Sequence, residues 1–306
     1  MKPYKKGPFL TSNHTQKPIM ESKFFRSFLI TIITSIFFFL LPISSDSSMD
    51  FLRTLTGVRP GTSAAGISKL KQYLIAIGHM SEKSQFANND NFDEELVHAI
   101  KSYQKFFSLP VTGFLNPETL DQLQKPRCGV PDNPTATQSR IPAVSYFSFF
   151  PGKPRWSPTK KTLSYSFPKG TRQDAYAAIS AATKEWSQQA PLKFAQTPDY
   201  DKADVKISFQ VRDHGDGSAF DGPGGVLAHA FAPPDGRLHF DGDEQWVDAA
   251  QAGKMDLETV GLHELGHVLG LGHSTDKDAV MWPYIDFGVR KHLNKDDIDG
   301  IKALYK

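Results

Sequence analysis

The chain has 306 residues, of which 39% are hydrophobic and 22% are charged, and its formal net charge at pH 7 is +2. This length and composition predict a globular protein with two domains, or one domain preceded by a substantial extra segment. The small net charge argues against nucleic acid or an anionic membrane surface as a partner. A single cysteine, Cys128, excludes an intrachain disulfide, and a lone cysteine is by itself typical of a small buried apolar residue.

The N-terminal residues have the pattern of a targeting segment. Lys23 and Arg26 precede an apolar run at 28–41, and a short stretch of small and polar residues follows. We interpret residues 1–45 as a signal for secretion, so we expect an extracellular protein. The run is shorter than the roughly 20 residues that span a membrane, but an uncleaved signal anchor that tethers the protein is the alternative. Translation from Met20 in place of Met1 also stays open.

Residues 46–132 are predicted to form a small helical domain. Apolar residues recur at helical spacing over 67–77 and over 93–107, and Asn116 followed by Pro117 predicts the start of a third helix. Residues 133–158 contain many prolines and few periodic apolar positions, so we interpret them as a linker.

Residues 159–306 alternate between strand and helix patterns. Strands are predicted at 163–167, 192–195, 205–210, 226–231 and 238–240. Helices are predicted at 171–189, 256–269 and 294–305. A loop rich in Gly and Asp covers 212–225. This order predicts an α+β domain in which a few helices pack on a sheet.

One helix of this domain contains a pattern for a metal site. His263 and His267 are four residues apart, so a helix places both imidazoles on one face, where they can share a metal. Glu264 stands beside the first histidine, and Gly270 allows a sharp exit that brings His273 round as a third ligand. Three protein ligands leave a fourth position open, which is typical of a catalytic zinc. Two surface histidines on an ordinary helix are the alternative.

These motifs resemble known ones. The run from His263 to His273 is similar to the metzincin signature, and Pro126-Arg127-Cys128-Gly129-Val130-Pro131-Asp132 is similar to the propeptide segment of matrix metalloproteinases. The resemblance covers residues 60–306 and ends just after the last predicted helix, as in plant members that lack a hemopexin domain. It implies a twisted, mostly parallel five-stranded sheet with three helices, preceded by a three-helix propeptide of the peptidoglycan-binding type.

The same resemblance implies roles for several residues. Cys128 is expected to be the fourth ligand of the catalytic zinc in a latent form, which agrees with the preference of zinc for thiolate. Arg127 and Asp132 are expected to pair and to hold this propeptide latch in the cleft. Met281 is expected to be the Met-turn residue beneath the metal.

A second group of histidines lies in and beside the Gly-rich loop. His214, Asp216, His229 and His239 offer three imidazoles and one carboxylate, a closed set of four ligands that predicts a structural zinc. The related family binds a second zinc at these four positions. Scattered polar residues in a loop are the alternative interpretation.

Carboxylates around this group predict calcium. Asp221, Asp241 and Glu244 are hard oxygen ligands, and the resemblance adds the backbone carbonyls of Gly222, Gly224 and Val226. A further family calcium would use Asp204, but the segment between His229 and His239 is shorter than in typical members. At least one calcium is therefore expected and their number is open, with solvated loop charges as the rival interpretation.

Together these features predict a secreted, latent, zinc-dependent metalloendopeptidase in which Glu264 acts as general base. Its expected partners are protein or peptide substrates, from the extracellular matrix or cell wall, and an activating protease; we expect a monomer that binds no nucleic acid. Residues 281–292 are expected to wall the specificity pocket, whose preference the sequence does not define. The alternatives are an inactive homologue that binds polypeptides without cutting them, and a metal-stabilised structural domain.

Overall fold

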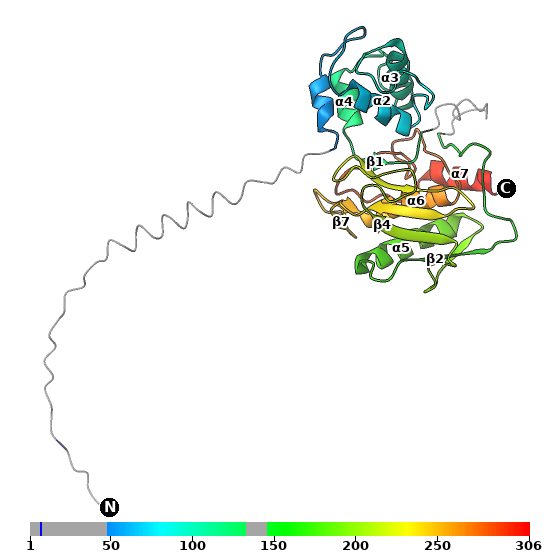
Figure 1. The fold of residues 1–306 in the computed structure, drawn as a ribbon. Coiled ribbons are helices and arrows are strands. Elements are labelled where there is room, and N and C mark those ends of the chain that lie inside the picture. The colour runs from blue at the N-terminus through cyan, green and yellow to red at the C-terminus, as the bar shows by residue number, and fades with distance from the viewer. Residues whose placement is uncertain (1–6, 8–47, 133–145) are drawn as a thin grey trace, which may run out of the picture. The chain divides into compact units, whose positions relative to one another are not determined.

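The computed structural model describes residue 7 and residues 48–132 and 146–306 (Figure 1). The predicted signal segment lies outside the described residues apart from Gly7, and so does most of the first half of the predicted linker. All described residues from Ser48 onward belong to one unit of the structure, Asp46–Lys306. Within the described part, no helix combines the length and the hydropathy that crossing a membrane requires.

The first part of this unit is a small helical bundle. Its elements are the 3-10 helix η1 (Asp50–Leu55) and the helices α2 (Ile67–Ala76), α3 (Glu94–Phe106) and α4 (Pro117–Leu123). Asp93 and Asn116 cap α3 and α4, because their side chains accept hydrogen bonds from the backbone N–H groups of Leu96 and Thr119. The three α-helices are the three that periodicity predicts, whereas η1 has no counterpart in the sequence prediction.

The second part contains a six-stranded sheet in the spatial order β1-β5-β6-β4-β2-β3. Its strands are β1 (Arg127–Cys128), β2 (Thr162–Ser166), β3 (Lys193–Gln196), β4 (Val205–Gln210), β5 (Val226–Ala230) and β6 (Arg237–Asp241). Neighbouring strands are parallel except β5 and β6, which are antiparallel. The five strands β2 to β6 confirm the predicted mostly parallel sheet. The sixth, β1, comes from the segment around Cys128 and was not predicted.

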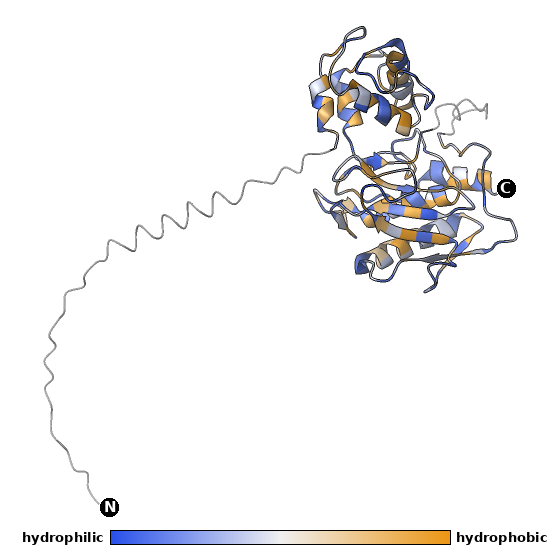
Figure 2. Cartoon of the chain, viewed as in Figure 1, coloured by the Kyte–Doolittle hydropathy of each residue, from blue (hydrophilic) through white to orange (hydrophobic). Residues whose placement is uncertain are grey.

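Three helices complete this domain, as predicted: α5 (Gln173–Gln189), α6 (Leu257–Val268) and α7 (Lys295–Leu304). A short pair of parallel strands, β7 (Trp246–Val247) and β8 (Met255–Asp256), leads directly into α6. Helices α5 and α6 pack closely, since a β-carbon on Gly261 would lie 2.5 Å from Ile179 Cδ1. Their apolar faces join those of the sheet in one buried core, and Figure 2 shows the apolar and polar residues along these elements.

The structure differs from the sequence prediction over residues 146–158, the second half of the predicted linker at 133–158. This stretch packs against the C-terminal domain. The Trp156 side chain is buried, and its indole N–H donates to the backbone oxygen of Val268 at 2.9 Å, while the backbone N–H of Tyr146 donates to a carboxylate at the start of α7. Prolines prevent regular structure here, but they do not prevent irregular backbone from packing on a core through aromatic side chains.

Candidate catalytic site

Helix α6 and the turn after it bring three imidazoles together. Nε2 of His267 lies 3.1 Å from Nε2 of His263 and 3.2 Å from Nε2 of His273. Gly270 makes the turn possible for two reasons: its φ is +104°, and a β-carbon there would lie 2.3 Å from the backbone oxygen of Pro154. Two nitrogens about 2.0–2.1 Å from one tetrahedral zinc are about 3.3 Å apart, so the spacing fits that metal.

The contacts of the other ring nitrogens define where the protons lie. Nδ1 of His263 is 2.7 Å from the backbone oxygen of Val280, and Nδ1 of His267 is 2.8 Å from that of Leu271. A carbonyl oxygen only accepts, so each Nδ1 carries the proton and each Nε2 of a neutral ring holds a lone pair. Burial lowers the pKa of both imidazoles well below its ordinary value, which keeps them neutral. Lone pairs that face one another at 3.1 Å repel, and a shared divalent cation removes that repulsion.

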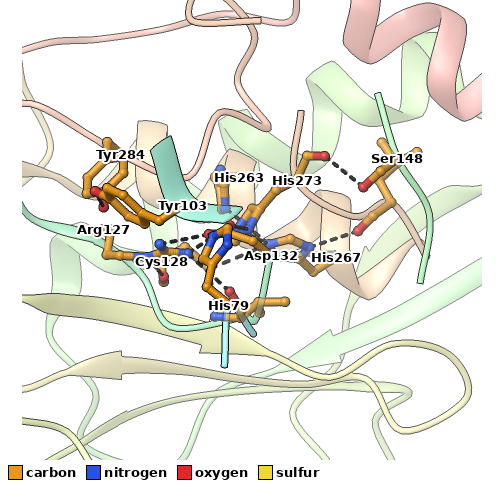
Figure 3. A network of polar contacts seen from close by, with 12 residues as sticks. His79, Tyr103, Arg127, Cys128, Asp132, Ser148, His263, His267, His273 and Tyr284 are labelled. Carbon is orange, nitrogen blue, oxygen red and sulfur yellow. Dashed lines mark hydrogen bonds and ion pairs between the residues drawn. The ribbon is translucent and has the colours of Figure 1, made fainter. Parts of the chain in front are cut away.

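The thiol of Cys128 completes the group. Its Sγ lies 3.5 Å from Nε2 of His267, and the four ligand atoms of Cys128, His263, His267 and His273 all lie within 4.8 Å of one another (Figure 3). All four residues are buried. Three imidazoles and one thiolate form a donor set that suits zinc, so the residues fit the metal that the sequence predicts.

Backbone contacts hold Cys128 in a groove between two segments of the C-terminal domain. On one side, its N–H donates to the backbone oxygen of Pro283 at 2.9 Å. On the other side, the N–H of Gly129 donates to the backbone oxygen of Ala228 in β5 at 2.8 Å. A β-carbon on Gly129 would lie 2.7 Å from Val226 Cγ1, so the groove accepts only glycine there without movement. The thiol is therefore placed by main-chain pairing on both flanks.

The predicted pair of Arg127 and Asp132 is present, and both side chains are fully buried. The guanidinium donates to both carboxylate oxygens, at 3.0 and 2.9 Å, and also to the backbone oxygens of Cys128 and Val130. Its plane lies over the ring of Tyr284, 5.2 Å from the centroid. Although burial would raise the pKa of the Asp132 carboxyl, the Arg127 charge holds it well below its usual range. The ion pair closes the loop around Cys128.

Glu264 lies on α6 next to the first imidazole. Both oxygens of its carboxyl group are buried and make no hydrogen bond of normal geometry among the described residues, although the Cys128 thiol interacts with the carboxyl. Burial raises the pKa of this carboxyl to about 8. A buried carboxyl without such a hydrogen bond is costly in a structural role, so this group is placed to exchange a proton with something that enters the site.

Met281 packs against α6, and its role as the Met-turn residue stays a prediction. A β-carbon on Gly266 would lie 2.3 Å from its Sδ, so the glycine between the two helical histidines makes room for it. The turn is fixed by Asp297, whose carboxylate accepts hydrogen bonds from the backbone N–H groups of Val280 and Met281 at 2.9 and 3.0 Å. The sequence shows Asp297 as a helix-capping residue, and the capping box with Asn294 is present. Its second role, beneath the site, has no sequence signal.

The second predicted metal group is also assembled. One carboxylate oxygen of Asp216 lies 2.8–2.9 Å from a ring nitrogen of each of His214, His229 and His239. Nδ1 of His214 is 2.9 Å from the backbone oxygen of Arg212, which only accepts, so this nitrogen carries a proton while Nε2 faces the carboxylate. Burial lowers the pKa of His229 to about 4, which keeps this imidazole neutral at neutral pH. Imidazole nitrogens that converge on a carboxylate fit a cation between them.

The predicted calcium ligands lie in the same loop region. Burial raises the pKa of the Asp221 and Asp241 carboxyls, and it raises the pKa of Glu244 to about 7. The backbone N–H groups of the other predicted ligands donate to these carboxylates: Gly222 to Asp241, Gly224 to Glu244 and Val226 to Asp221. Asp221 also accepts a hydrogen bond from the hydroxyl of Ser48, at 2.6 Å. Neighbouring buried carboxylates fit a hard cation.

Asp204, the candidate for a further calcium, has protein partners. One oxygen accepts hydrogen bonds from the N–H and hydroxyl of Ser164, both at 2.8 Å, and the other pairs with Lys160. These contacts tie β2 to the start of β4.

Two more residues join the site without a signal in the sequence. His79 follows α2, and its Nε2 lies 3.0 Å from Asp132 Oδ2. The hydroxyl of Ser148 donates to the backbone oxygen of His273 at 2.7 Å (Figure 3). Both come from far along the chain and from stretches without a motif, so only the folded arrangement identifies them.

Comparison with known proteins agrees with this geometry. Residues 155–306 match the family model described as Matrixin, and residues 63–123 match that of a peptidoglycan binding domain. The chain is 44% identical over 262 residues to metalloendoproteinase 1 of Glycine max, which covers 82% of this chain and 85% of that relative. It is 40% identical over 316 residues to metalloendoproteinase 5-MMP of Arabidopsis thaliana, covering 92% and 87%.

A relative from Rattus norvegicus matches much of the same chain. Stromelysin-1 of Rattus norvegicus is 40% identical over 252 residues, which is 79% of this chain and 50% of that protein. The two plant relatives are matched over more than four fifths of their length, and the converging imidazoles suit the zinc that this family uses. A propeptide-type domain ahead of a matrixin domain, in a chain so similar to metalloendoproteinases, means that this protein is a metalloendopeptidase and belongs to the matrixin family.

Proposed function

We propose that the protein is a secreted endopeptidase made as a latent precursor, in which Cys128 blocks the catalytic zinc site until the propeptide is removed. The observation that carries this proposal is the position of the Cys128 thiol, buried among the imidazoles of His263, His267 and His273. A thiolate in the fourth ligand position excludes the water that peptide hydrolysis requires. Residues 46–132 then form the propeptide and residues 159–306 the catalytic domain.

Glu264 is the proposed general base. The imidazoles of His263, His267 and His273 would hold the zinc, which would supply Lewis-acid chemistry for activating water and a peptide carbonyl. The Glu264 carboxylate takes a proton from the attacking water and passes it to the leaving amine. Its position beside His263 on α6 supports this role, because that position brings its carboxyl group next to the three imidazoles.

The groove that holds the propeptide is the proposed site for polypeptide substrates. There the backbone around Cys128 pairs with Ala228 of β5 on one side and with Pro283 on the other. An extended substrate that replaces the propeptide finds the same main-chain donors and acceptors, which is strand addition at the edge of a sheet. This supports cleavage within a chain, since such a groove accepts an extended segment and not only a terminus.

The other metal groups are proposed to stabilise the loop between β4 and β5. His214, Asp216, His229 and His239 supply four ligands for a structural zinc. Asp221, Asp241 and Glu244 supply oxygen ligands for at least one calcium, with the backbone carbonyls of Gly222, Gly224 and Val226. The raised pKa values of the three carboxyls support a cation there, because a cation offsets the cost of burying their charge.

The proposals on secretion and on the class of substrate rest on the sequence alone. The signal pattern in residues 1–45 supports release into the extracellular space, where matrix or cell-wall proteins are the proposed substrates. An activating protease, or self-cleavage, is proposed to cut between the latch and the catalytic domain. The alternative of an inactive homologue finds no support in a site that retains Glu264 and all three imidazoles.

The test uses the purified full-length precursor and an internally quenched peptide library. We expect no cleavage before activation, cleavage after proteolytic removal of the propeptide, and loss of activity with a zinc chelator that added zinc restores. The matched variant Glu264→Gln keeps the size of the side chain and should keep the zinc, but it should cleave nothing. Activated Glu264→Gln protein that cleaves peptides at the wild-type rate would refute the proposed role of Glu264.

A further inference from the structure

Asp132 stands at the centre of a network that joins the propeptide to the metal site (Figure 3). Its Oδ1 lies 2.7 Å from Nδ1 of His273, and its Oδ2 lies 3.0 Å from Nε2 of His79. Arg127 donates to both oxygens. His79 in turn contacts the hydroxyl of Ser102, in α3, through Nδ1 at 3.0 Å. The side chains of Asp132 and its three direct partners are fully buried.

The direction of each hydrogen bond follows from the arginine. A guanidinium stays protonated, so it pairs with an ionised carboxylate that can only accept. Nδ1 of His273 therefore donates to Asp132, and its Nε2 presents a lone pair toward His263 and His267. The carboxylate thus selects the tautomer of His273 that a metal ligand requires.

The other two imidazoles obtain the same support from a different source. Nδ1 of His263 donates to the backbone oxygen of Val280, and Nδ1 of His267 donates to that of Leu271, so both are oriented within the catalytic domain itself. For His273, no atom of residues 146–306 accepts a hydrogen bond from Nδ1 within the described structure. Its partner is Asp132, which precedes the segment where the activating cleavage is proposed.

We propose that Asp132 is a positioning residue for His273: the docked propeptide lends this carboxylate to the third metal-ligating imidazole, so the precursor holds its catalytic zinc more tightly than the cleaved enzyme does. This inference rests on the proposed role of His273 as a zinc ligand. The proposed role differs from that of a latch, because holding the propeptide in place needs only the ion pair between Asp132 and Arg127, whereas positioning needs the contact with His273. Cleavage then removes two groups from the metal site. One is the Cys128 thiolate, and the other is the Asp132 carboxylate that accepts a hydrogen bond from His273.

The test measures the release of zinc from the full-length precursor into a colorimetric chelator, not activity. Removing a hydrogen-bond partner of a ligating histidine weakens metal binding by about 10–100-fold, so we expect Asp132→Ala to speed zinc release by a factor in that range. Asp132→Asn keeps an oxygen that can accept from Nδ1 and should restore part of the difference. It also serves as the informative variant if Asp132→Ala does not fold.

Two control variants separate positioning from simple undocking. Arg127→Met breaks the latch ion pair but leaves the Asp132 carboxylate beside His273, and His79→Gln removes only the contact toward the bundle. Because Cys128 is the single thiol of the chain, a thiolate-to-cobalt absorption band in cobalt-loaded protein reports whether the cysteine is still bound. We expect both controls to release zinc more slowly than Asp132→Ala.

The outcomes are distinct. Two results would overturn the positioning role. The first is zinc release from Asp132→Ala at the wild-type rate. The second is release from Asp132→Ala at the rate of Arg127→Met, with an equal loss of the cobalt band in both variants. A wild-type precursor that shows no thiolate-to-cobalt band would instead defeat the proposed latent site itself. Faster release from Asp132→Ala than from Arg127→Met, at an equal or stronger cobalt band, is the result that the proposal requires.

Discussion

Gly266 and Met281 occupy complementary positions on two sides of the metal site, and a β-carbon on the glycine would lie 2.3 Å from the methionine sulfur. The same β-carbon would lie 3.1 Å from the buried ring of Trp186. The helix that carries two imidazoles therefore rests on a thioether at one of its two glycines, Gly266. Any change at Gly266 acts on the histidines and on the turn beneath them together.

Gly266→Ala should destabilise the protein despite the better helix propensity of alanine. Alanine stabilises a helix by about 1 kcal/mol relative to glycine, but extra volume in a packed core costs about 1–3 kcal/mol, so we expect a net loss of up to about 2 kcal/mol in the free energy of unfolding. Urea unfolding of the metal-loaded chain measures it. Ser180→Ala, at an exposed position of α5, is the control and should change stability by less than about 0.5 kcal/mol. Equal midpoints for Gly266→Ala and wild type would contradict the packing argument.

Cys128→Ala should convert the precursor into an active enzyme without cleavage. The variant loses the sulfur but keeps the main-chain pairing that seats the segment, so we expect partial activity that rises further when the propeptide is removed. Peptide hydrolysis by protein shown to be full-length by mass spectrometry measures this. The double variant Cys128→Ala with Glu264→Ala controls for a contaminating protease and should show no peptide hydrolysis. A full-length Cys128→Ala protein as inactive as the wild-type precursor would count against the latch.

His239→Ala should remove one zinc ion and leave the catalytic one. The side chain offers one of the four ligand atoms in the group of His214, Asp216, His229 and His239, and the three ligands that remain should bind zinc weakly. Metal analysis after gel filtration should give two zinc ions per wild-type chain and one per His239→Ala chain. His98→Ala, at an exposed histidine outside both metal groups, should keep two. Two tightly bound zinc ions in His239→Ala would show that the group does not form a zinc site.

Asp256→Asn should destabilise the protein near neutral pH and much less in acid. The buried Asp256 carboxylate caps α6 through Thr259 and pairs with Arg290, and hydrogen bonds to charged groups contribute about 1.5–3 kcal/mol. Burial would raise its pKa, but the bonds from Arg290 and Thr259 hold it below the usual value of about 4. A depressed folded-state pKa gives stability that is complete above that value and is lost as the pH falls through the folded-state pKa.

The measurement is the difference in unfolding free energy between wild type and Asp256→Asn at a series of pH values. We expect a gap of about 1.5–3 kcal/mol at pH 7 that narrows below about pH 4. Asp299→Asn, an exposed carboxylate in α7, controls for general charge effects and should show a small gap throughout. A gap that stays constant or widens in acid would contradict the assigned ion pair.

The sequence predicts the elements and the local ligands well because both depend on short-range patterns. The helical period places His263 beside His267, and Asn116 followed by Pro117 predicts a helix start that the structure confirms. Element boundaries differ by one or two residues at most, as in α5, which begins at Gln173 and not at Thr171. Alternation similarly predicts the strands of the sheet.

Long-range partners could not be predicted in the same way. His79 and Ser148 belong to stretches with no periodicity or motif, yet one contacts Asp132 and the other fixes the backbone of His273. The strand β1 is only two residues long and exists because the main chain around Cys128 finds an open edge on β5. Such contacts join residues that are far apart in the sequence, and no local pattern of residues predicts which of them will lie together.

Two aromatic residues of the catalytic domain, Trp282 and Tyr284, are buried in the core of the helical bundle, where both rings pack against Phe107. Two side chains of the proposed catalytic domain therefore form part of the core of the helical bundle. A bundle that is released by cleavage would lack these two rings and would contain a cavity in its core. We therefore expect it to unfold more readily than it does in the intact chain. An unfolded fragment would not rebind to the groove, so the shared core would make the proposed activation irreversible.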